Sequence, residues 1–126
     1  MFYPIRSDTG AVLPYEQHPA AAGTYASGML LTYSNGKLSV ADNPEASTKL
    51  YLCVSNDTVA DGGLLTVAAA RSDVVYRCPL EGAQDQSAGD MLGVSGGKQL
   101  SADAANKIFQ ITAIMEDNIV EGRFIK

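Results

Sequence analysis

Histidine, cysteine and basic residues are scarce in this chain of 126 residues. His18 is the only histidine, and Cys53 and Cys78 are the only cysteines, which excludes a closed zinc site built from Cys and His ligands. Nine Lys and Arg residues are outnumbered by 14 Asp and Glu residues, which gives a net charge of -5 at pH 7. Nucleic-acid binding needs clustered basic side chains, and here they are scattered. We therefore expect no metal, no cofactor and no nucleic acid as a partner.

Long hydrophobic runs are missing as well. No stretch approaches the roughly 20 apolar residues that a membrane-spanning helix needs. Residues 1–6 lack the positive and apolar regions of a secretory signal. We expect no membrane contact. We also expect the two thiols to be reduced and buried, because disulfides form in oxidising compartments.

One motif has the spacing of a catalytic nucleophile. Gly93-Val94-Ser95-Gly96-Gly97 fits the Gly-x-Ser-x-Gly pattern, which works where a strand-to-helix turn exposes the serine to a histidine base. No long helix is predicted after Ser95, and His18 precedes it, against the serine–acid–histidine order of that fold. We interpret the segment as a glycine turn and expect no catalytic residue and no enzyme. Catalysis by two carboxylates stays open as an alternative, because it needs only Asp and Glu.

A short pattern occurs twice in the chain and predicts an internal repeat, at residues 27–57 and 87–117. In each copy a glycine precedes an apolar strand, a glycine turn and a second short strand, and a further alternating strand follows. Duplicated hairpin modules are typical of a small β-barrel or β-sandwich built from two similar halves. The matching segments are Ser27-Gly28-Met29-Leu30, Tyr33–Ser39 and Lys49–Val54 in the first copy, and Ala88–Leu92, Val94–Ser101 and Lys107–Thr112 in the second.

The remaining pattern is that of a mainly β protein. Asn35-Gly36 is a type I′ hairpin turn, and residues 50–55 alternate with apolar side chains on both faces, as in a central strand. Residues 23–126 are predicted to form a single β domain of seven to ten short strands, with one helical turn near residues 102–106. Core packing is expected for the strand aromatics, with a ligand-stacking face as the alternative: Tyr25, Tyr33, Tyr51, Tyr76 and Phe109.

Residues 1–22 differ from the rest, because they hold three of the five prolines. Proline removes a backbone donor, so we expect an extended N-terminal arm with at most one edge strand. The arm either contacts a partner or packs back on its own domain. If it contacts a partner, its aromatic and apolar residues are the anchors: Phe2, Tyr3, Pro4, Ile5 and Tyr15.

Several turn and strand motifs carry a family resemblance over residues 23–80. They are Gly28-Met29-Leu30-Leu31, Asn35-Gly36-Lys37-Leu38, Tyr51–Ser55 and Asp61–Val67. The segment resembles tailed-phage capsid decoration proteins, also called cement or head-stabilising proteins. The chain departs from that pattern at Cys53-Val54, where the family has Gly-Val, and its second half matches only loosely.

The resemblance implies a structural protein without enzymatic activity. Such a protein binds the outer surface of a viral capsid and stabilises the shell by bridging subunits, with the major capsid protein as its partner. The resemblance further implies a homotrimer on the virion surface, assembled in the host cytoplasm. The alternative from the residues alone is a generic β-barrel binding module for a sugar or a peptide, which needs an exposed aromatic cleft.

Overall fold

The computed structural model describes residues 1–10, 13–81, 85–116 and 118–125, and within them it contains 13 β-strands and no helix. The mainly β prediction is confirmed. The strands are β1 (Tyr3–Ser7), β2 (Glu16–Pro19), β3 (Gly23–Tyr25), β4 (Leu30–Ser34), β5 (Lys37–Val40), β6 (Tyr51–Cys53), β7 (Asp57–Val59), β8 (Leu64–Ala69), β9 (Val74–Pro79), β10 (Met91–Ser95), β11 (Gln99–Ser101), β12 (Phe109–Ile114) and β13 (Ile119–Phe124).

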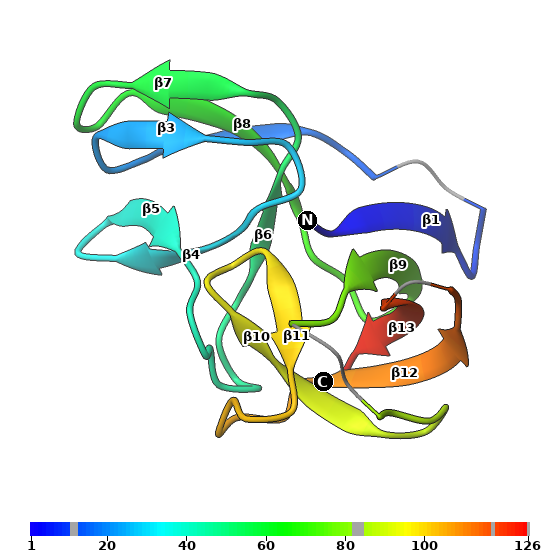
Figure 1. Ribbon diagram of the computed structural model, residues 1–126. Coiled ribbons are helices and arrows are strands. Elements are labelled where there is room, and N and C mark those ends of the chain that lie inside the picture. Colours follow the sequence, from blue (N-terminus) through cyan, green and yellow to red (C-terminus); the bar gives the residue numbers. More distant parts are fainter. Residues whose placement is uncertain (11–12, 82–84, 117, 126) are drawn as a thin grey trace.

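The strands form three antiparallel sheets. The orders are β1-β9-β13-β12-β10-β11, β2-β8-β6-β4-β5 and β3-β7. Figure 1 shows two lobes, with β2 to β8 in one and β9 to β13 together with β1 in the other. Neither large sheet closes into a continuous barrel, so the fold corresponds to the sandwich-like alternative.

Five strands in each lobe follow the same plan. We call residues 16–70 the first module and residues 74–125 the second module. The order β2-β8-β6-β4-β5 in the first corresponds strand by strand to β9-β13-β12-β10-β11 in the second. In both, a single parallel bridge brings the two ends of the series together, Ala20 with Leu38 and Leu80 with Leu100. These modules include the recurring sequence ranges 27–57 and 87–117 and extend beyond them.

Individual backbone hydrogen bonds repeat between the modules. Gly28 N–H donates to the Cys53 carbonyl at 2.8 Å, and Gly89 N–H donates to the Ile111 carbonyl at 2.7 Å. Both glycines have a φ of 96°, a left-handed conformation that costs glycine little. Three further pairs correspond: Ala20 to Gly63 and Leu80 to Asn118, Ala21 to Leu38 and Glu81 to Leu100, and Ala70 to Leu50 and Ile125 to Ile108.

The modules share apolar packing. One cluster lies within the first module and contains Leu31, Tyr51 and Leu65. The larger cluster combines residues of the second module with Leu30 and Leu52 of the first. In β6, Leu52 belongs to the larger cluster and Tyr51 and Cys53 to the other, so the prediction of a central strand covered on both faces within residues 50–55 is confirmed.

Residues 102–106 form bends, so the predicted helical turn is wrong. Lys107 Nζ donates to the carbonyls of Ala102 and Ala104, the second at 2.6 Å. Asn106 is held by Asn43, whose Oδ1 accepts from the Asn106 backbone N–H at 3.0 Å. These side chains satisfy the backbone without a helical ladder, and so compete with it.

The N-terminal segment forms two edge strands in two different sheets, so the expectation of at most one is wrong. β1 pairs with β9, and β2 pairs with β8. Pro4 and Pro19 fit because the unpaired side of an edge strand needs no N–H donor. Of the two alternatives for residues 1–22, the structure has these strands packed on their own chain.

Gly122 is required where β13 pairs with β12. A Cβ at this position would lie 2.1 Å from the Gln110 carbonyl oxygen and 2.5 Å from Cε1 of Phe109. We expect Gly122→Ala to lower the free energy of unfolding by about 2–3 kcal/mol or more, as overpacked cores do. The matched control is Gly23→Ala, whose Cβ would meet no atom closer than 3.8 Å. Chemical denaturation measures both, and equal stabilities for the two variants would contradict this packing.

Candidate functional site

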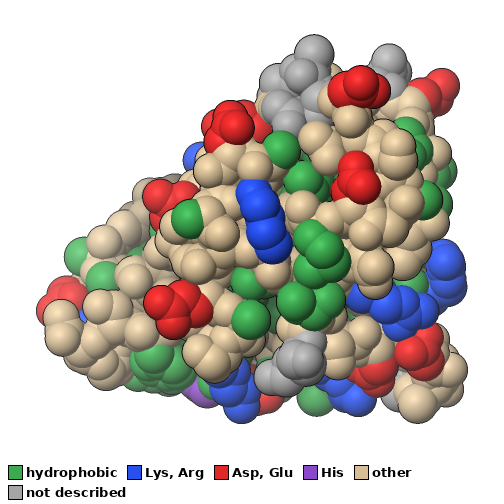
Figure 2. All heavy atoms as spheres, turned by 90° about the horizontal axis from the view of Figure 1, so that it is seen from below, with side chains coloured by type: hydrophobic (Ala, Val, Ile, Leu, Met, Phe, Trp, Pro, Cys, Tyr) green, Lys and Arg blue, Asp and Glu red, His purple; other side chains and the backbone are tan. Residues whose placement is uncertain are grey.

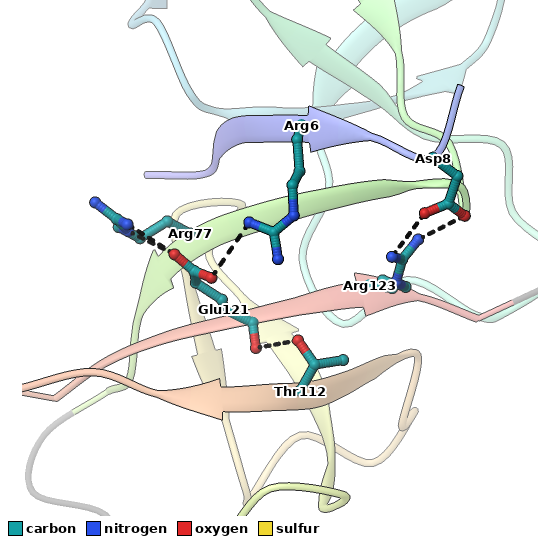
Figure 3. A network of polar contacts seen from close by, with 6 residues as sticks. All are labelled: Arg6, Asp8, Arg77, Thr112, Glu121 and Arg123. Atoms are coloured by element: carbon teal, nitrogen blue, oxygen red, sulfur yellow. Dashed lines mark hydrogen bonds and ion pairs between the residues drawn. The ribbon is translucent and has the colours of Figure 1, made fainter. Parts of the chain in front are cut away.

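β1 is fixed to the second module by ion pairs on the outer face of the sheet (Figure 3). Glu121 of β13 accepts from Arg77 of β9 at 2.7 Å and lies 3.9 Å from Arg6 of β1. Beyond the end of β1, Asp8 and Arg123 form a pair with contacts of 2.8 and 3.0 Å. The Glu121 side chain is nearly buried, and its two arginine partners compensate for that burial.

Phe2 was predicted to contact a partner, but it lies in the core. Its side chain is 0% exposed, and its ring centroid lies 6.2 Å from that of Phe109 and 5.8 Å from that of Phe124. Its N–H donates to the Gly28 carbonyl at 2.8 Å. Burial of the whole phenylalanine ring is favourable in free energy. Because the ring packs in the second module and the N–H is bonded to the first, Phe2 anchors β1 to both modules.

The other four predicted anchors lie around a groove of about 460 Å³. Tyr3, Ile5 and Tyr15 are 51%, 39% and 67% exposed, and Pro4 is exposed as well. The opposite wall comes from the first module, with Leu52, Cys53, Val54 and Ala68. The structure thus brings together Tyr3, Pro4, Ile5 and Tyr15 around one apolar depression, which Phe2 also lines although its side chain is fully buried.

A free strand edge borders this groove. Among the described strands β1 pairs only with β9, so no described strand covers the second edge of residues 3–6. The pairing is irregular between Pro4 and Arg6, which leaves Ile5 outside the regular register. Exposed apolar side chains beside an open edge are the features that recognise an extended peptide.

A second group of residues was missed by the sequence interpretation. We call Glu16, His18, Tyr33 and Tyr51 the His18 cluster. His18 Nδ1 is hydrogen-bonded to the Tyr33 hydroxyl, and His18 Nε2 lies 2.8 Å from Oε1 of Glu16. The His18 ring centroid lies 4.8 Å from that of Tyr51 and 5.6 Å from that of Tyr33. Desolvation, with smaller effects of Tyr51 and Glu16, raises the pKa of the Tyr33 phenol.

The sequence contained one signal for this cluster: Tyr33 and Tyr51 are strand aromatics, for which a ligand-stacking face was the alternative to core packing. The core prediction is confirmed for Tyr25, Tyr51, Tyr76 and Phe109, but it is wrong for Tyr33, which is 40% exposed. His18 and Glu16 were assigned to an extended arm with at most one edge strand, so nothing predicted that they would lie near Tyr33. β2 pairs with β8, and β8 pairs with β6, the strand that carries Tyr51, so these residues come together only in the folded sheet.

The residues considered for chemistry do not converge. Ser95 ends β10, and its hydroxyl donates to the Glu81 carboxylate at 3.3 Å, while Gly96 and Gly97 have positive φ and form the turn. Cys53 and Cys78 are free and buried, as expected, and burial raises the pKa of both thiols. In the part of the chain that the structure describes, no three His, Cys, Asp or Glu residues are grouped to hold a metal ion, and no helix could span a membrane.

Charges are dispersed on the face of the molecule shown in Figure 2. Acidic and basic side chains are both scattered over this face, and hydrophobic side chains gather in a hollow near the centre of the view.

The anchoring of β1 by Phe2 can be tested by mutation. We expect Phe2→Ala to lower the free energy of unfolding by about 3–5 kcal/mol, the usual cost of removing a fully buried phenylalanine. Tyr3→Ala is the matched control, since Tyr3 is adjacent but half exposed, and its cost should stay below about 1 kcal/mol. Urea denaturation gives both values. A small effect of Phe2→Ala would mean that β1 is not held by this side chain.

In the comparisons with known proteins, no family model and no curated protein matches this chain.

Proposed function

We propose that this protein is a structural protein that binds the outer surface of a viral capsid and stabilises the shell by bridging subunits. The partner is the major capsid protein. The observation that carries the proposal is the groove beside the free edge of β1, where Tyr3, Ile5 and Tyr15 are exposed together. The resemblance of residues 23–80 to capsid decoration proteins points to the same role.

The groove supports binding of an extended segment of the capsid protein. A segment laid along β1 gains main-chain hydrogen bonds from the open edge, and its side chains enter the apolar depression. Exposed aromatic residues such as Tyr3 and Tyr15 are favoured as binding hot spots. Because Phe2 and the Glu121 ion pairs already hold β1, little conformational entropy is lost on binding.

The physical basis of shell stabilisation is simple. A shell under internal pressure fails at the seams between subunits, and a rigid β protein that bridges a seam adds buried area that failure must expose. Many copies multiply a modest contact energy through avidity. We infer a homotrimer on the virion surface, assembled in the host cytoplasm, because three copies would place three grooves on neighbouring subunits.

The test is co-sedimentation with purified procapsids and with expanded capsids of the virus that encodes the chain. We expect binding to the expanded form. The double variant Tyr3→Ser, Ile5→Ser should weaken it at least tenfold, since loss of hot-spot anchors costs more than about 1.4 kcal/mol. The control is Ile114→Ser, because Ile114 is similarly exposed but lies on β12, away from the groove. Light scattering checks for the trimer.

Two outcomes would count against the proposal. Failure to bind either form of the capsid would reject the capsid role. Equal losses for the groove variant and the Ile114 variant would reject the groove as the contact surface. A peptide-binding module is the second candidate, since an open edge beside an apolar groove binds extended peptides, and binding of peptides without binding of capsids would favour it.

A further inference from the structure

The same strand edge is covered by β1 in the second module and is open in the first. β9 of the second module and β2 of the first are equivalent strands. In the second module, β1 lies along β9 with Tyr3 opposite Arg77. The residue equivalent to Arg77 is Gln17. Arg77 lies two residues before Pro79 and pairs with Glu121 of β13. Gln17 likewise lies two residues before Pro19 and pairs with Thr66 of β8. In the described structure β2 is an edge strand, with no strand in the place that β1 occupies on β9.

Backbone groups of β2 are available at this edge. Ala20 N–H donates to the Gly63 carbonyl, and antiparallel ladders alternate, so the N–H and C=O of Gln17 point away from β8. Pro19 lies in the same phase and has no N–H to leave unpaired. In the second module, the corresponding groups of Arg77 face Tyr3 of β1. The first module therefore presents the backbone pattern that β1 uses in the second.

The side chains beside the two edges also differ: those of the second module are mainly apolar, and those of the first include polar groups. Next to β1, Phe2 completes a group of aromatic rings in the second module, with ring centroids of Phe109 and Phe124 5.1 Å apart. Position 69, equivalent to Phe124 by its pairing, is an alanine, and the rings packed against Tyr51, the equivalent of Phe109, are those of His18 and Tyr33. The remaining equivalent positions form the His18 cluster: Glu16, His18, Tyr33 and Tyr51 stand where the second module has Tyr76, Cys78, Val94 and Phe109.

We propose that the free edge of β2 together with the His18 cluster is a second docking site. Its occupant is an extended segment of a partner polypeptide that pairs with Gln17 and places an aromatic side chain against His18 and Tyr33. The occupant is inferred from the second module, where a strand with an aromatic neighbour covers the equivalent edge. The polar groups Glu16, His18 and Tyr33 keep this surface compatible with water while it is empty, which the apolar residues of the second module would not do.

This site is independent of the proposed capsid role, because it lies on β2 and does not use the groove beside β1. A chain with both sites could hold two extended segments at once. Its partner at β2 is recognised by strand pairing and one aromatic anchor, so neither a sugar nor a nucleic acid would satisfy the site.

The experiment is an NMR titration of the isotope-labelled full-length protein with a synthetic peptide of sequence Met-Phe-Tyr-Pro-Ile-Arg-Ser-Asp. This peptide copies residues 1–8, the segment that covers the equivalent edge. We expect amide shift changes at residues 16–19 and at Tyr33. A peptide with alanine in place of its phenylalanine should bind about tenfold more weakly, as for the loss of one aromatic hot spot.

Two protein variants separate backbone pairing from side-chain contact. Gln17→Pro removes the outward N–H and should weaken binding at least tenfold, the loss expected for a disrupted strand pairing, whereas Gln17→Ala keeps the backbone and should bind like the unmodified chain. Pro is tolerated on an edge strand. If Gln17→Pro does not fold, Tyr33→Ala tests the side-chain contact instead, because Tyr33 is exposed and its loss should weaken binding several-fold.

Three results would overturn the proposal. They are no shift changes with the peptide in large excess, shift changes confined to β9 and β13, which would mean that the peptide exchanges with β1, and equal affinities of the Gln17→Pro and Gln17→Ala variants. Each of these differs from failure of the capsid assay, which reads the groove beside β1.

Discussion

The burial of Phe2 is the interaction on which the surface of this molecule depends. Its side chain lies within the second module, and its backbone N–H is bonded to Gly28 of the first. This contact fixes the position of β1 on β9. The position of β1 in turn determines the wall that β1 forms for the groove and the open edge that it presents. The attachment of β1 to the second module is mainly apolar, and the ion pairs of Glu121 and Arg123 orient β1 on the sheet.

The repeated strand arrangement explains why the two modules can carry different side chains at equivalent positions. Each is a series of five strands whose ends meet at one bridge, so the pairing among those five strands lies within the module. Among the described residues, only single backbone bonds, such as that from the Leu30 N–H to the Gly97 carbonyl, join the two modules. Side chains at equivalent positions are then free to differ. The second module uses them to build an aromatic core with β1, and the first has a histidine, a carboxylate and a tyrosine hydroxyl at the same places.

Local features of the fold could be predicted from the sequence, and contacts between distant segments could not. The Asn35-Gly36 turn between β4 and β5 is visible in two adjacent residues whose positive φ the turn requires. The exposure of Tyr3, Ile5 and Tyr15 follows from a proline-rich segment at an edge. The burial of Phe2 depends instead on Phe109 and Phe124, and no pattern near Phe2 refers to them. The His18 cluster was missed for the same reason, since it exists only once β2 is paired with β8.

The pairing of β1 with β9 also orders events during synthesis. Strand β1 is made first, yet its partners β9 and β13 leave the ribosome only after the whole first module. Residues 16–70 hold their own core and can fold while the chain is still growing, because domains form as their residues emerge. Until then residues 2–7 remain an unpaired apolar segment, free to bind a chaperone or a neighbouring nascent chain. The six-stranded sheet is therefore completed only when β1 pairs with a strand that is made after the whole first module.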